Sequence, residues 1–384
     1  MKVTTATRLE SVKEYYFSKK LREVNGLIQA GKPVLNMGIG SPDLPPHPSV
    51  VEALQAAMDH PKANMYQSYQ GLPELREAIA HFYDRNYKVL LDPAAEILPL
   101  MGSKEGIMHI SMAFLNKGDQ VLIPNPGYPT YSAVTQLVEA TPVFYDLSAQ
   151  HHWQPDFEKL ATLDTSKIKL MWLNYPHMPT GANADDTTLQ KLIQWAAKEE
   201  ILLINDNPYS FILNDTPQSI LSLPGAKDVA MELNSLSKSF NMAGWRVGML
   251  SGNAANIQAV LKVKSNMDSG MFYGIQQGAI AALNTADSWF TDLNATYKKR
   301  RALIEELALL MNATFDPNSV GMFVWAKLND GALSSEAFID KILYEKDIFI
   351  TPGTIFGTQG EGYIRFSLCV NEDQIITAIN RMKA

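Results

Sequence analysis

The chain has 384 residues, of which 46% are hydrophobic and 19% are charged, a balance typical of a globular protein with two domains. The formal net charge of −7 and the lack of a basic stripe argue against nucleic-acid binding. No apolar run reaches the ~18 to 20 residues needed to span a bilayer, and the first residues lack the apolar core of a signal peptide. The single cysteine, Cys369, excludes an internal disulfide and a CxxC metal site, so we expect a cytoplasmic protein without a metal centre.

From about residue 95, short apolar runs alternate with amphipathic stretches. The runs predict strands over residues 96–101, 120–124, 141–147, 167–174, 201–207, 228–236 and 246–252. Helical patterns lie between several of them, for example over 104–116 and 186–200. This alternation predicts an α/β fold with a mostly parallel, seven-stranded sheet sandwiched by helices.

The pattern changes after residue 285. A long charged helix is expected over 286–312, and strand-like runs follow at 321–328, 347–353 and 362–369, before a C-terminal helix. We expect these segments to form a smaller α/β domain together with the N-terminal residues. The chain is therefore divided into an N-terminal arm and part of the small domain (1–44), a large domain (45–285) and a small C-terminal domain (286–384).

The stretch MGSKEGI, residues 101–107, follows a predicted strand and begins a helix. Ser103 and Lys104 would place backbone N–H groups, a hydroxyl and an amine at the positive end of that helix, which is a phosphate site in physical terms. The alternative is an ordinary serine N-cap. The stretch GIGSPD, residues 38–43, lacks the third glycine of the dinucleotide fingerprint, so a nucleotide site is not expected there.

Further reactive side chains follow the later strands. Asp206 and Tyr209 lie at the end of one strand, Lys238 follows the next, and Arg246 begins the last. A carboxylate there would meet a cationic ring nitrogen, and a desolvated lysine forms Schiff bases. The alternatives are a turn at 205–210 and a solvated surface lysine. Because ligands bind at the carboxyl ends of parallel strands, these groups are expected to converge, and together they suit pyridoxal phosphate.

Over its full length the chain resembles the class I/II aminotransferases of the fold-type I pyridoxal-phosphate family. The matching stretches, in family order, are NMGIGSPD, YQGLPELREAI, MGSKEGI, PNPGYPTY, MPTGA, NDNPYS, SLSKSFNMAGWRVG and GYIRFSL. The resemblance implies transamination between an L-amino acid and a 2-oxo acid, by way of an internal aldimine (a Schiff base) on Lys238. It also implies that pyridoxal 5'-phosphate is the cofactor, that the large domain binds it, and that the chain forms a homodimer.

The resemblance assigns roles to single residues. Lys238 resembles the lysine that carries the cofactor and moves the proton, Asp206 the carboxylate that keeps the ring nitrogen protonated, and Tyr209 the phenol that hydrogen-bonds the cofactor's phenolic oxygen. Tyr128 resembles the aromatic residue stacked on the ring. The residues implied as phosphate ligands are Ser103, the backbone of Lys104, Ser235 and Arg246, with Tyr66 reaching the partner subunit's phosphate.

The substrate carboxylate is assigned to two residues. Arg365 resembles the arginine that holds the α-carboxylate with two hydrogen bonds, and Gly40 the glycine whose backbone lies beside it. Arginines for a distal carboxylate cannot be assigned, and the triplet Tyr15, Tyr16 and Phe17 is a candidate for an apolar pocket wall, although hydrophobic core explains it equally well. We therefore expect a substrate with a neutral or apolar side chain, and we expect residues 262–276 to border the partner's site.

One residue departs from the family pattern. The family has asparagine directly before PTG, where it donates to the cofactor's phenolic oxygen, whereas this chain has Met178, which cannot donate. Either Tyr209 supports that oxygen alone, or His177 or Asn174 has taken over. The departure leaves a second reaction open, β-elimination from a cysteine S-conjugate. A third hypothesis, a cofactor-sensing regulator, is disfavoured because no helix-turn-helix or basic segment is found.

Overall fold

The computed structural model describes residues 3–10, 16–329, 331 and 333–384, with Tyr16 described by its backbone alone. Its largest sheet has seven strands in the order β2-β8-β7-β6-β5-β3-β4. They are β2 (Ile97–Leu100), β3 (Gln120–Asn125), β4 (Thr141–Asp146), β5 (Ile168–Leu173), β6 (Leu202–Asp206), β7 (Ala230–Ser235) and β8 (Gly248–Gly252). Strand β8 is antiparallel to both neighbours and the other pairs are parallel, which confirms the predicted sheet.

The strands form where the apolar runs predict them, because the sheet is buried on both faces. In β5, Leu170 and Trp172 belong to the hydrophobic core on one face, and Met171 and Leu173 to the core on the other. A strand covered on both sides reads as a nearly continuous apolar run rather than an alternation, and in β5 the one exposed residue is Lys169, near its start.

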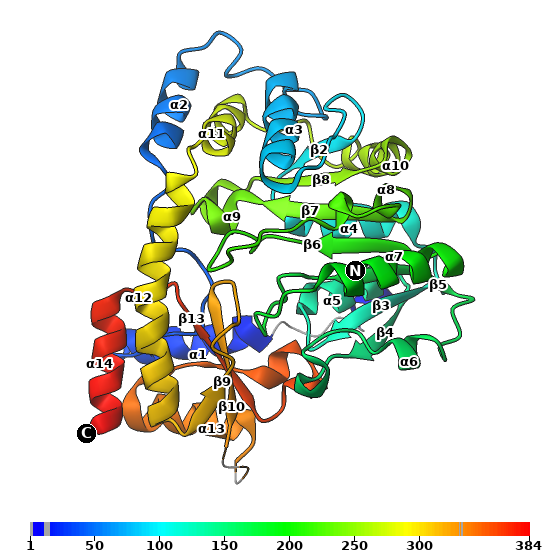
Figure 1. Ribbon diagram of the computed structural model, residues 1–384. Coiled ribbons are helices and arrows are strands. Elements are labelled where there is room, and N and C mark those ends of the chain that lie inside the picture. Colours follow the sequence, from blue (N-terminus) through cyan, green and yellow to red (C-terminus); the bar gives the residue numbers. More distant parts are fainter. Residues whose placement is uncertain (1–2, 11–15, 330, 332) are drawn as a thin grey trace.

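Two layers of helices cover this sheet (Figure 1). The core on one face includes α4 (Ser103–Phe114), α5 (Pro129–Leu137) and α10 (Ala254–Lys264). The opposite core includes α3 (Pro73–Tyr87), α7 (Asp186–Glu199) and α11 (Tyr273–Leu283), with α2 (Pro48–Met58) packed on α11. Three single-turn helices complete this part of the molecule: α6 (Phe157–Leu160), α8 (Ala226–Val229) and α9 (Leu236–Ser239).

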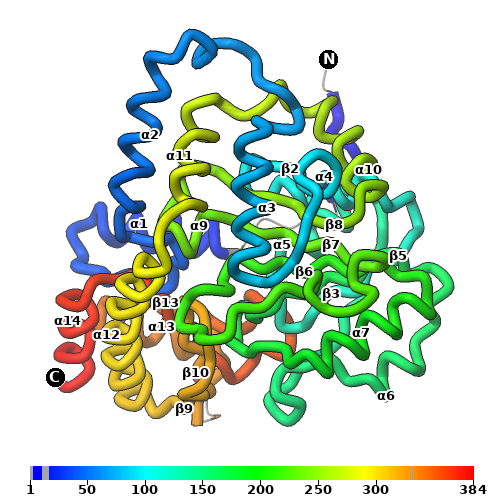
Figure 2. Tube along the Cα trace, turned by 45° about the horizontal axis from the view of Figure 1, so that its top comes forward, coloured from blue at the N-terminus to red at the C-terminus, as the bar shows by residue number. Residues whose placement is uncertain are grey.

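The smaller part of the molecule is built on a four-stranded antiparallel sheet in the order β12-β13-β10-β9. Its strands are β9 (Ala313–Phe315), β10 (Phe323–Leu328), β12 (Thr351–Pro352) and β13 (Tyr363–Ser367). The helices around it are α1 (Tyr16–Gln29), α12 (Ser288–Leu310), α13 (Ser335–Lys346) and α14 (Glu372–Lys383). Figure 2 shows α12 running from beside α2 and α11 to this small sheet, with α14 next to it.

Both ends of the chain contribute to the smaller part. The short strand β1 (Leu35–Asn36) pairs in parallel with β11 (Ile348–Phe349), and Val24 and Met37 are buried in the same core as α12 and α14. The predicted strand at 347–353 is divided at Ile350, because β11 pairs with β1 while β12 pairs with β13. Strands β1 and β9 were not predicted, since two or three residues are too few to show a pattern. The domain boundaries at 44 and 285 stay a prediction.

Among the described residues, no helix is both long and apolar enough to cross a membrane.

A buried arginine links the N-terminal segment to the smaller part of the molecule. Arg300 on α12 is 2% exposed and donates to both carboxylate oxygens of Asp43, at 2.7 and 2.9 Å. It also donates to the Leu368 carbonyl oxygen at 3.0 Å and lies 3.4 Å from Glu372. The two-pronged geometry and the further acceptors compensate for the desolvation of the cation. Arg300 therefore links the segment before α2 to the end of β13, through Leu368, and to the start of α14, through Glu372.

We predict that Arg300→Leu lowers the free energy of unfolding by about 3 kcal/mol, because Asp43 loses its cation and remains partly buried. The matched control is Lys299→Leu on the same helix, where the exposed side chain should change stability by less than about 0.5 kcal/mol. Urea denaturation of both variants measures the difference. Equal effects of the two substitutions would show that the buried ion pair does not stabilise the fold.

Candidate active site

A cavity of about 330 Å³ lies where the carboxyl edge of the large sheet meets the small unit. All the site residues predicted from the sequence line it except Tyr66. Those that line it are Gly40, Ser103, Lys104, Tyr128, Asp206, Tyr209, Ser235, Lys238, Arg246 and Arg365. Most follow strand ends of the large sheet, whereas Gly40 follows β1 and Arg365 lies on β13. The volume is within the usual range for small-molecule sites.

One corner of the cavity is suited to an anion. Ser103 is the first residue of α4, and the N-cap is Gly102 with φ of 89°, so the helix has no side-chain cap on its first N–H groups. This excludes the alternative of a capping serine at 103. A Cβ at Gly102 would overlap the Arg246 guanidinium, so glycine is required for the arginine to lie against the turn. Ser235 lines the same cavity as Ser103 and Lys104. Helix dipole, free donors and guanidinium together favour a phosphate group.

A buried carboxylate faces the cavity from the end of β6. Asp206 is 5% exposed, and its Oδ2 accepts a hydrogen bond of 2.8 Å from the Tyr131 hydroxyl. Its Oδ1 has no hydrogen-bond partner among the described residues. Burial raises the pKa of Asp206 to about 6, although the Tyr131 hydrogen bond and the charge of Lys238 act in the opposite direction. The arrangement leaves one acceptor oxygen available to a donor inside the cavity.

Lys238 lies in α9, directly after β7, and its ammonium donates to the carbonyl oxygen of Gly40. Burial lowers the pKa of Lys238, and the charges of Arg365 and Arg246 act in the same direction. An amine with a lowered pKa is more often neutral and is then a nucleophile. The alternative of a solvated surface lysine is therefore wrong.

The opposite wall of the cavity consists of aromatic side chains that surround one guanidinium, that of Arg365. Arg365 is 5% exposed and lies over the rings of Phe323 and Phe356, 3.9 and 4.7 Å from their centroids. One of its nitrogens donates to the Gly38 carbonyl oxygen at 2.8 Å. Tyr209 meets the Phe323 ring edge-on, and burial raises the pKa of its hydroxyl. This wall combines apolar surface with one cation suited to a carboxylate.

Met178 occupies the position that the sequence singled out. It lines the cavity, and its sulfur lies 3.5 Å from an Arg365 nitrogen.

Of the two candidate replacements, His177 does not line the cavity. Its ring nitrogens lie 2.8 Å from the Thr180 hydroxyl and 3.1 Å from the Pro126 carbonyl oxygen, and burial lowers its pKa to about 3. Asn174 lines the cavity, but its amide oxygen accepts from the Met178 N–H. Its amide nitrogen donates to the carbonyl oxygen of Asp206. The geometry therefore rules out His177 as the replacement donor.

Sequence reasoning missed several lining residues. Tyr131, which orients Asp206, lies three positions after Tyr128 on α5, so the helical repeat could have revealed it. Phe323 and Phe356 gave no local signal, since each looks like core. Of the candidate pocket triplet, Phe17 lines the cavity, Tyr15 lies outside the described residues, and the side chain of Tyr16 is not described.

Tyr66 stands apart from the cavity in this chain. It is 90% exposed and lies in the segment after α2, near the exposed side chains of Met65 and Tyr69. Gly270 packs tightly against the carbonyl oxygen of Gln67, so the loop after α10 supports this segment.

The chain is similar over nearly its whole length to known proteins. The family model for class I and II aminotransferases matches residues 32–382. The LL-diaminopimelate aminotransferase of Aquifex aeolicus is 37% identical over 98% of this chain and 97% of its own length. That of Dehalococcoides mccartyi strain CBDB1 is 40% identical over 98% and 97%. Apo-BacF from Bacillus subtilis has a TM-score of 0.95 at 35% identity, covering 100% of this chain and 98% of BacF.

The raised pKa of Asp206 makes stability depend on pH. The folded chain holds this proton more tightly than the unfolded chain, so Asp206 lowers stability as the pH rises from the ordinary value of 3.8 through about 6. The difference corresponds to roughly 3 kcal/mol. We predict that Asp206→Asn makes the cofactor-free protein more stable by about that amount at pH 8, with little difference at pH 4.

Thermal unfolding of the two proteins across this pH range measures the effect. Asp156→Asn, a change at an N-cap near the surface, serves as the control and should not make the protein more stable at pH 8. A constant difference between Asp206→Asn and the parent protein at all pH values would contradict the assignment.

Proposed function

The chain belongs to the class I and II aminotransferases and is a pyridoxal-phosphate-dependent aminotransferase; we propose that its amino donor is an L-amino acid with a neutral or apolar side chain. The amino group passes to a 2-oxo acid in a second half-reaction. The observation that carries the proposal is the cavity itself, in which Lys238, Asp206, the anion corner and Arg365 share one space with an aromatic wall.

The residues of the cavity fit pyridoxal phosphate. The uncapped first turn of α4 and Arg246 would hold its phosphate. The Oδ1 atom of Asp206, which lacks a partner among the described residues, would accept the hydrogen bond of its ring nitrogen. Lys238 would bond to its aldehyde carbon, Tyr209 would donate to its phenolic oxygen, and Tyr128 would stack on its ring. Each assignment is a proposal for the residue named.

When bound, this cofactor supplies an aldehyde that condenses with amines and a ring that accepts electrons from the donor's α-carbon. Asp206, in its charged form, keeps a proton on the ring nitrogen and so strengthens that electron acceptance. Lys238 would take up the proton from the donor's α-carbon and carry it, a task for which a lowered amine pKa is suited. Met178 offers no donor, so Tyr209 is the residue that donates to the phenolic oxygen in this proposal.

Arg365 and Gly40 hold the substrate α-carboxylate, which orients the α-carbon toward Lys238. The guanidinium is suited to two parallel hydrogen bonds with a carboxylate. The rings of Phe323 and Phe356 both lie against the guanidinium and reduce its contact with water, which strengthens the charge interaction.

The apolar substrate class is supported by the residues around Arg365. Met178, Phe323 and Phe356 contact Arg365, and Phe17 and Ile355 line the same cavity. Among the described lining residues, the cations are Lys104, Lys238, Arg246 and Arg365, and each has a role at the cofactor or at the α-carboxylate. A distal carboxylate would have to be buried against apolar side chains, which costs free energy.

A second donor, LL-diaminopimelate, is favoured by the relatives that carry this name at 37% and 40% identity. The distal end of LL-diaminopimelate bears both an amine and a carboxylate. The two hypotheses therefore differ in whether the side chains around Arg365 contact charged groups of the substrate or apolar ones. The β-elimination alternative gains no support from the relatives reported above, which are named as aminotransferases.

An amino-donor panel tests the proposal. L-phenylalanine, L-leucine, L-methionine and LL-diaminopimelate are each supplied with 2-oxoglutarate or pyruvate, and new 2-oxo acid is measured, with Lys238→Ala as the inactive control. We expect a kcat/KM at least about tenfold higher for an apolar donor than for LL-diaminopimelate. A preference for LL-diaminopimelate would overturn the substrate class. Pyruvate and ammonia from a cysteine S-conjugate would support elimination instead.

Arg365→Lys tests the carboxylate contact. Lysine keeps the charge but makes one hydrogen bond where arginine makes two, so we predict a KM about 10 to 100 times higher for every amino acid and 2-oxo acid. The thermal stability and the visible spectrum of the bound cofactor should change little. A sharp loss of melting temperature with unchanged KM would show that Arg365 has a structural role.

We further propose that the enzyme is a cytoplasmic homodimer in which Tyr66 reaches the partner's cofactor phosphate. Tyr66 is 90% exposed, and the large apolar side chains exposed on the same or neighbouring segments are Met65, Tyr69, Met267 and Phe272. Such side chains are suited to burial against a second copy. The lone thiol, Cys369, is buried, as expected in a reducing compartment.

Subunit complementation tests the dimer. We predict that Tyr66→Phe and Lys238→Ala homodimers are each impaired, because one loses a phosphate contact and the other the amine. Heterodimers purified with two affinity tags should regain activity, since one of their two sites has an intact Lys238 and an intact partner tyrosine. Light scattering should give twice the chain mass of 42.6 kDa. Absence of recovery in the heterodimer would mean that Tyr66 acts within its own subunit.

A further inference from the structure

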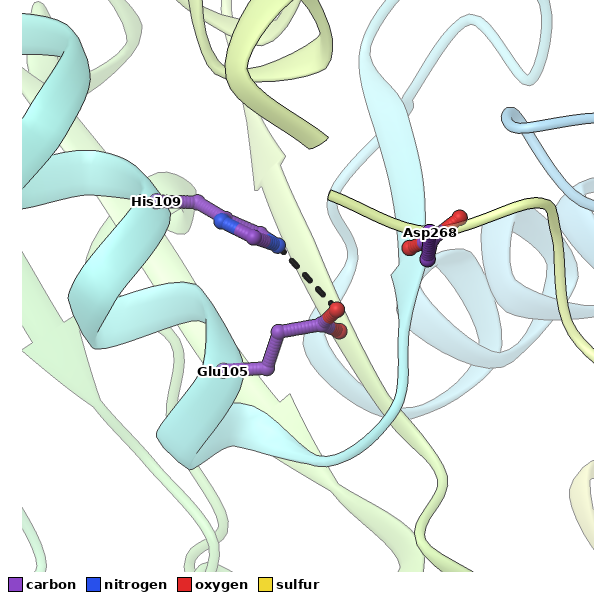
Figure 3. Close-up of side chains that lie close together, drawn as sticks. All are labelled: Glu105, His109 and Asp268. Carbon is purple, nitrogen blue, oxygen red and sulfur yellow. Dashed lines mark ion pairs between the residues drawn. The ribbon is translucent and has the colours of Figure 1, made fainter. Parts of the chain in front are cut away.

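A cluster of polar side chains lies at the first turns of α4, next to the anion corner formed by Ser103, Lys104 and Arg246. Figure 3 shows its members: Glu105 and His109 on α4, and Asp268 on the loop after α10. Their ligand-type atoms all lie within 4.8 Å of one another. His109 is 2% exposed. Three side chains of these types could bind a metal ion. Whether they do depends on the charges around them.

A lysine already supplies the cation. The Lys264 ammonium lies 2.6 Å from Asp268 Oδ2, and its side chain is 1% exposed. The other oxygen of Asp268 accepts from the Gly270 N–H at 2.8 Å. A divalent ion beside this ammonium would be repelled, and both Asp268 oxygens are occupied. The cluster is therefore a buried hydrogen-bond and charge network rather than a metal centre.

Glu105 connects this network to the turn before α4. Its Oε2 accepts a hydrogen bond of 2.6 Å from the Met101 N–H, and its Oε1 lies 3.1 Å from His109 Nε2. In a capping box, a glutamate at the third helical position accepts from the N–H of the N-cap residue, whereas Glu105 accepts from Met101, one residue before the N-cap. The second hydrogen bond of a capping box, from the N-cap side chain to a backbone N–H of the first turn, is missing because Gly102 has no side chain. The N–H groups of Ser103 and Lys104 thus lack a side-chain cap while the turn is held in place.

We propose that Glu105, whose carboxylate lies between the Met101 N–H and the His109 ring, is a positioning residue for the turn that binds the cofactor phosphate. The inference rests on the proposed function, in which this turn receives the phosphate of pyridoxal phosphate. Glu105 fixes the Met101 N–H, and so fixes Gly102 with its positive φ against Arg246. Asp268 packs against the same pair and belongs to the loop that supports Gln67, next to Tyr66. The network thereby holds the two segments proposed to contact phosphates.

Electrostatics alone gives the opposite expectation. A carboxylate in the first turn of α4 repels a phosphate, so its removal should tighten phosphate binding if charge were its only effect. A positioning residue behaves differently, because its loss releases the turn and weakens binding. The sign of the change in affinity therefore separates the two roles.

The experiment measures dissociation constants of inorganic phosphate, pyridoxal phosphate and pyridoxal for the cofactor-free protein. For Glu105→Ala we expect constants at least about tenfold larger for the two phosphate-bearing probes, since a hydrogen bond from a backbone N–H to a charged acceptor is lost. Pyridoxal, which has no phosphate, should bind unchanged. Glu105→Gln keeps an acceptor for the Met101 N–H and should restore much of the affinity. Glu74→Ala, which removes an exposed acid from the first turn of α3, is the matched control.

A second variant tests the part played by His109. His109→Leu removes the ring nitrogen that faces Glu105, and it should weaken binding of the same two probes. The double variant with Glu105→Ala should be no worse than Glu105→Ala alone, because His109 acts through Glu105. Melting temperatures show whether each variant is folded. If Glu105→Ala does not fold, Glu105→Gln and His109→Leu still test the proposal.

Two outcomes overturn the inference: unchanged or tighter phosphate binding in Glu105→Ala, or equal weakening of pyridoxal and pyridoxal phosphate. Failure of the parent protein to bind pyridoxal phosphate would instead reject the proposed function. The two failures are thus distinguishable in one set of titrations.

Discussion

The site depends on the parallel direction of β2, β6 and β7, which brings their carboxyl ends to one edge of the sheet. The residues that follow those ends are separated by many positions in the chain but share one cavity: Ser103, Asp206 and Lys238. This convergence has a cost, because each polar group is partly or wholly removed from water. The opposite charges of Asp206 and Lys238 offset part of it, and the raised pKa of Asp206 shows that burial is the larger effect.

The charges in the cavity explain why it suits an anionic ligand. Lysines and arginines outnumber the single lining carboxylate among the described residues, so the cofactor-free site carries an excess of positive charge. A phosphate at one end and a carboxylate at the other would neutralise that excess in two separate places. Burial is the main cause of the lowered pKa of Lys238, and the neighbouring cations Arg365 and Arg246 act in the same direction. The electrostatics that cost stability in the empty protein are those that prepare an amine for covalent chemistry.

The Arg365 end of the cavity is built by the small unit, in which segments from both ends of the chain are in contact. Strand β1 pairs with β11, which brings Gly38 and Gly40 beside Arg365 on β13. Arg300 holds Asp43 just beyond this segment. The aromatic side chains around Arg365 come from β10 and from the segment after β12, so under the proposed function substrate preference would depend on packing in this unit and cofactor binding on the large sheet.

The sequence by itself determined the seven strands, the long helix α12 and the set of reactive residues, because apolar runs and strand-end motifs depend on near neighbours in the chain. It did not determine the division of 347–353 into two strands, since the partners of β11 and β12 are remote segments. Nor did it reveal the contact of Met178 with Arg365, which are 187 positions apart, or that of His109 with Asp268. The tertiary structure decided which side chains surround Arg365 and which residues contact the turn before α4, because these contacts form only when distant segments pack together.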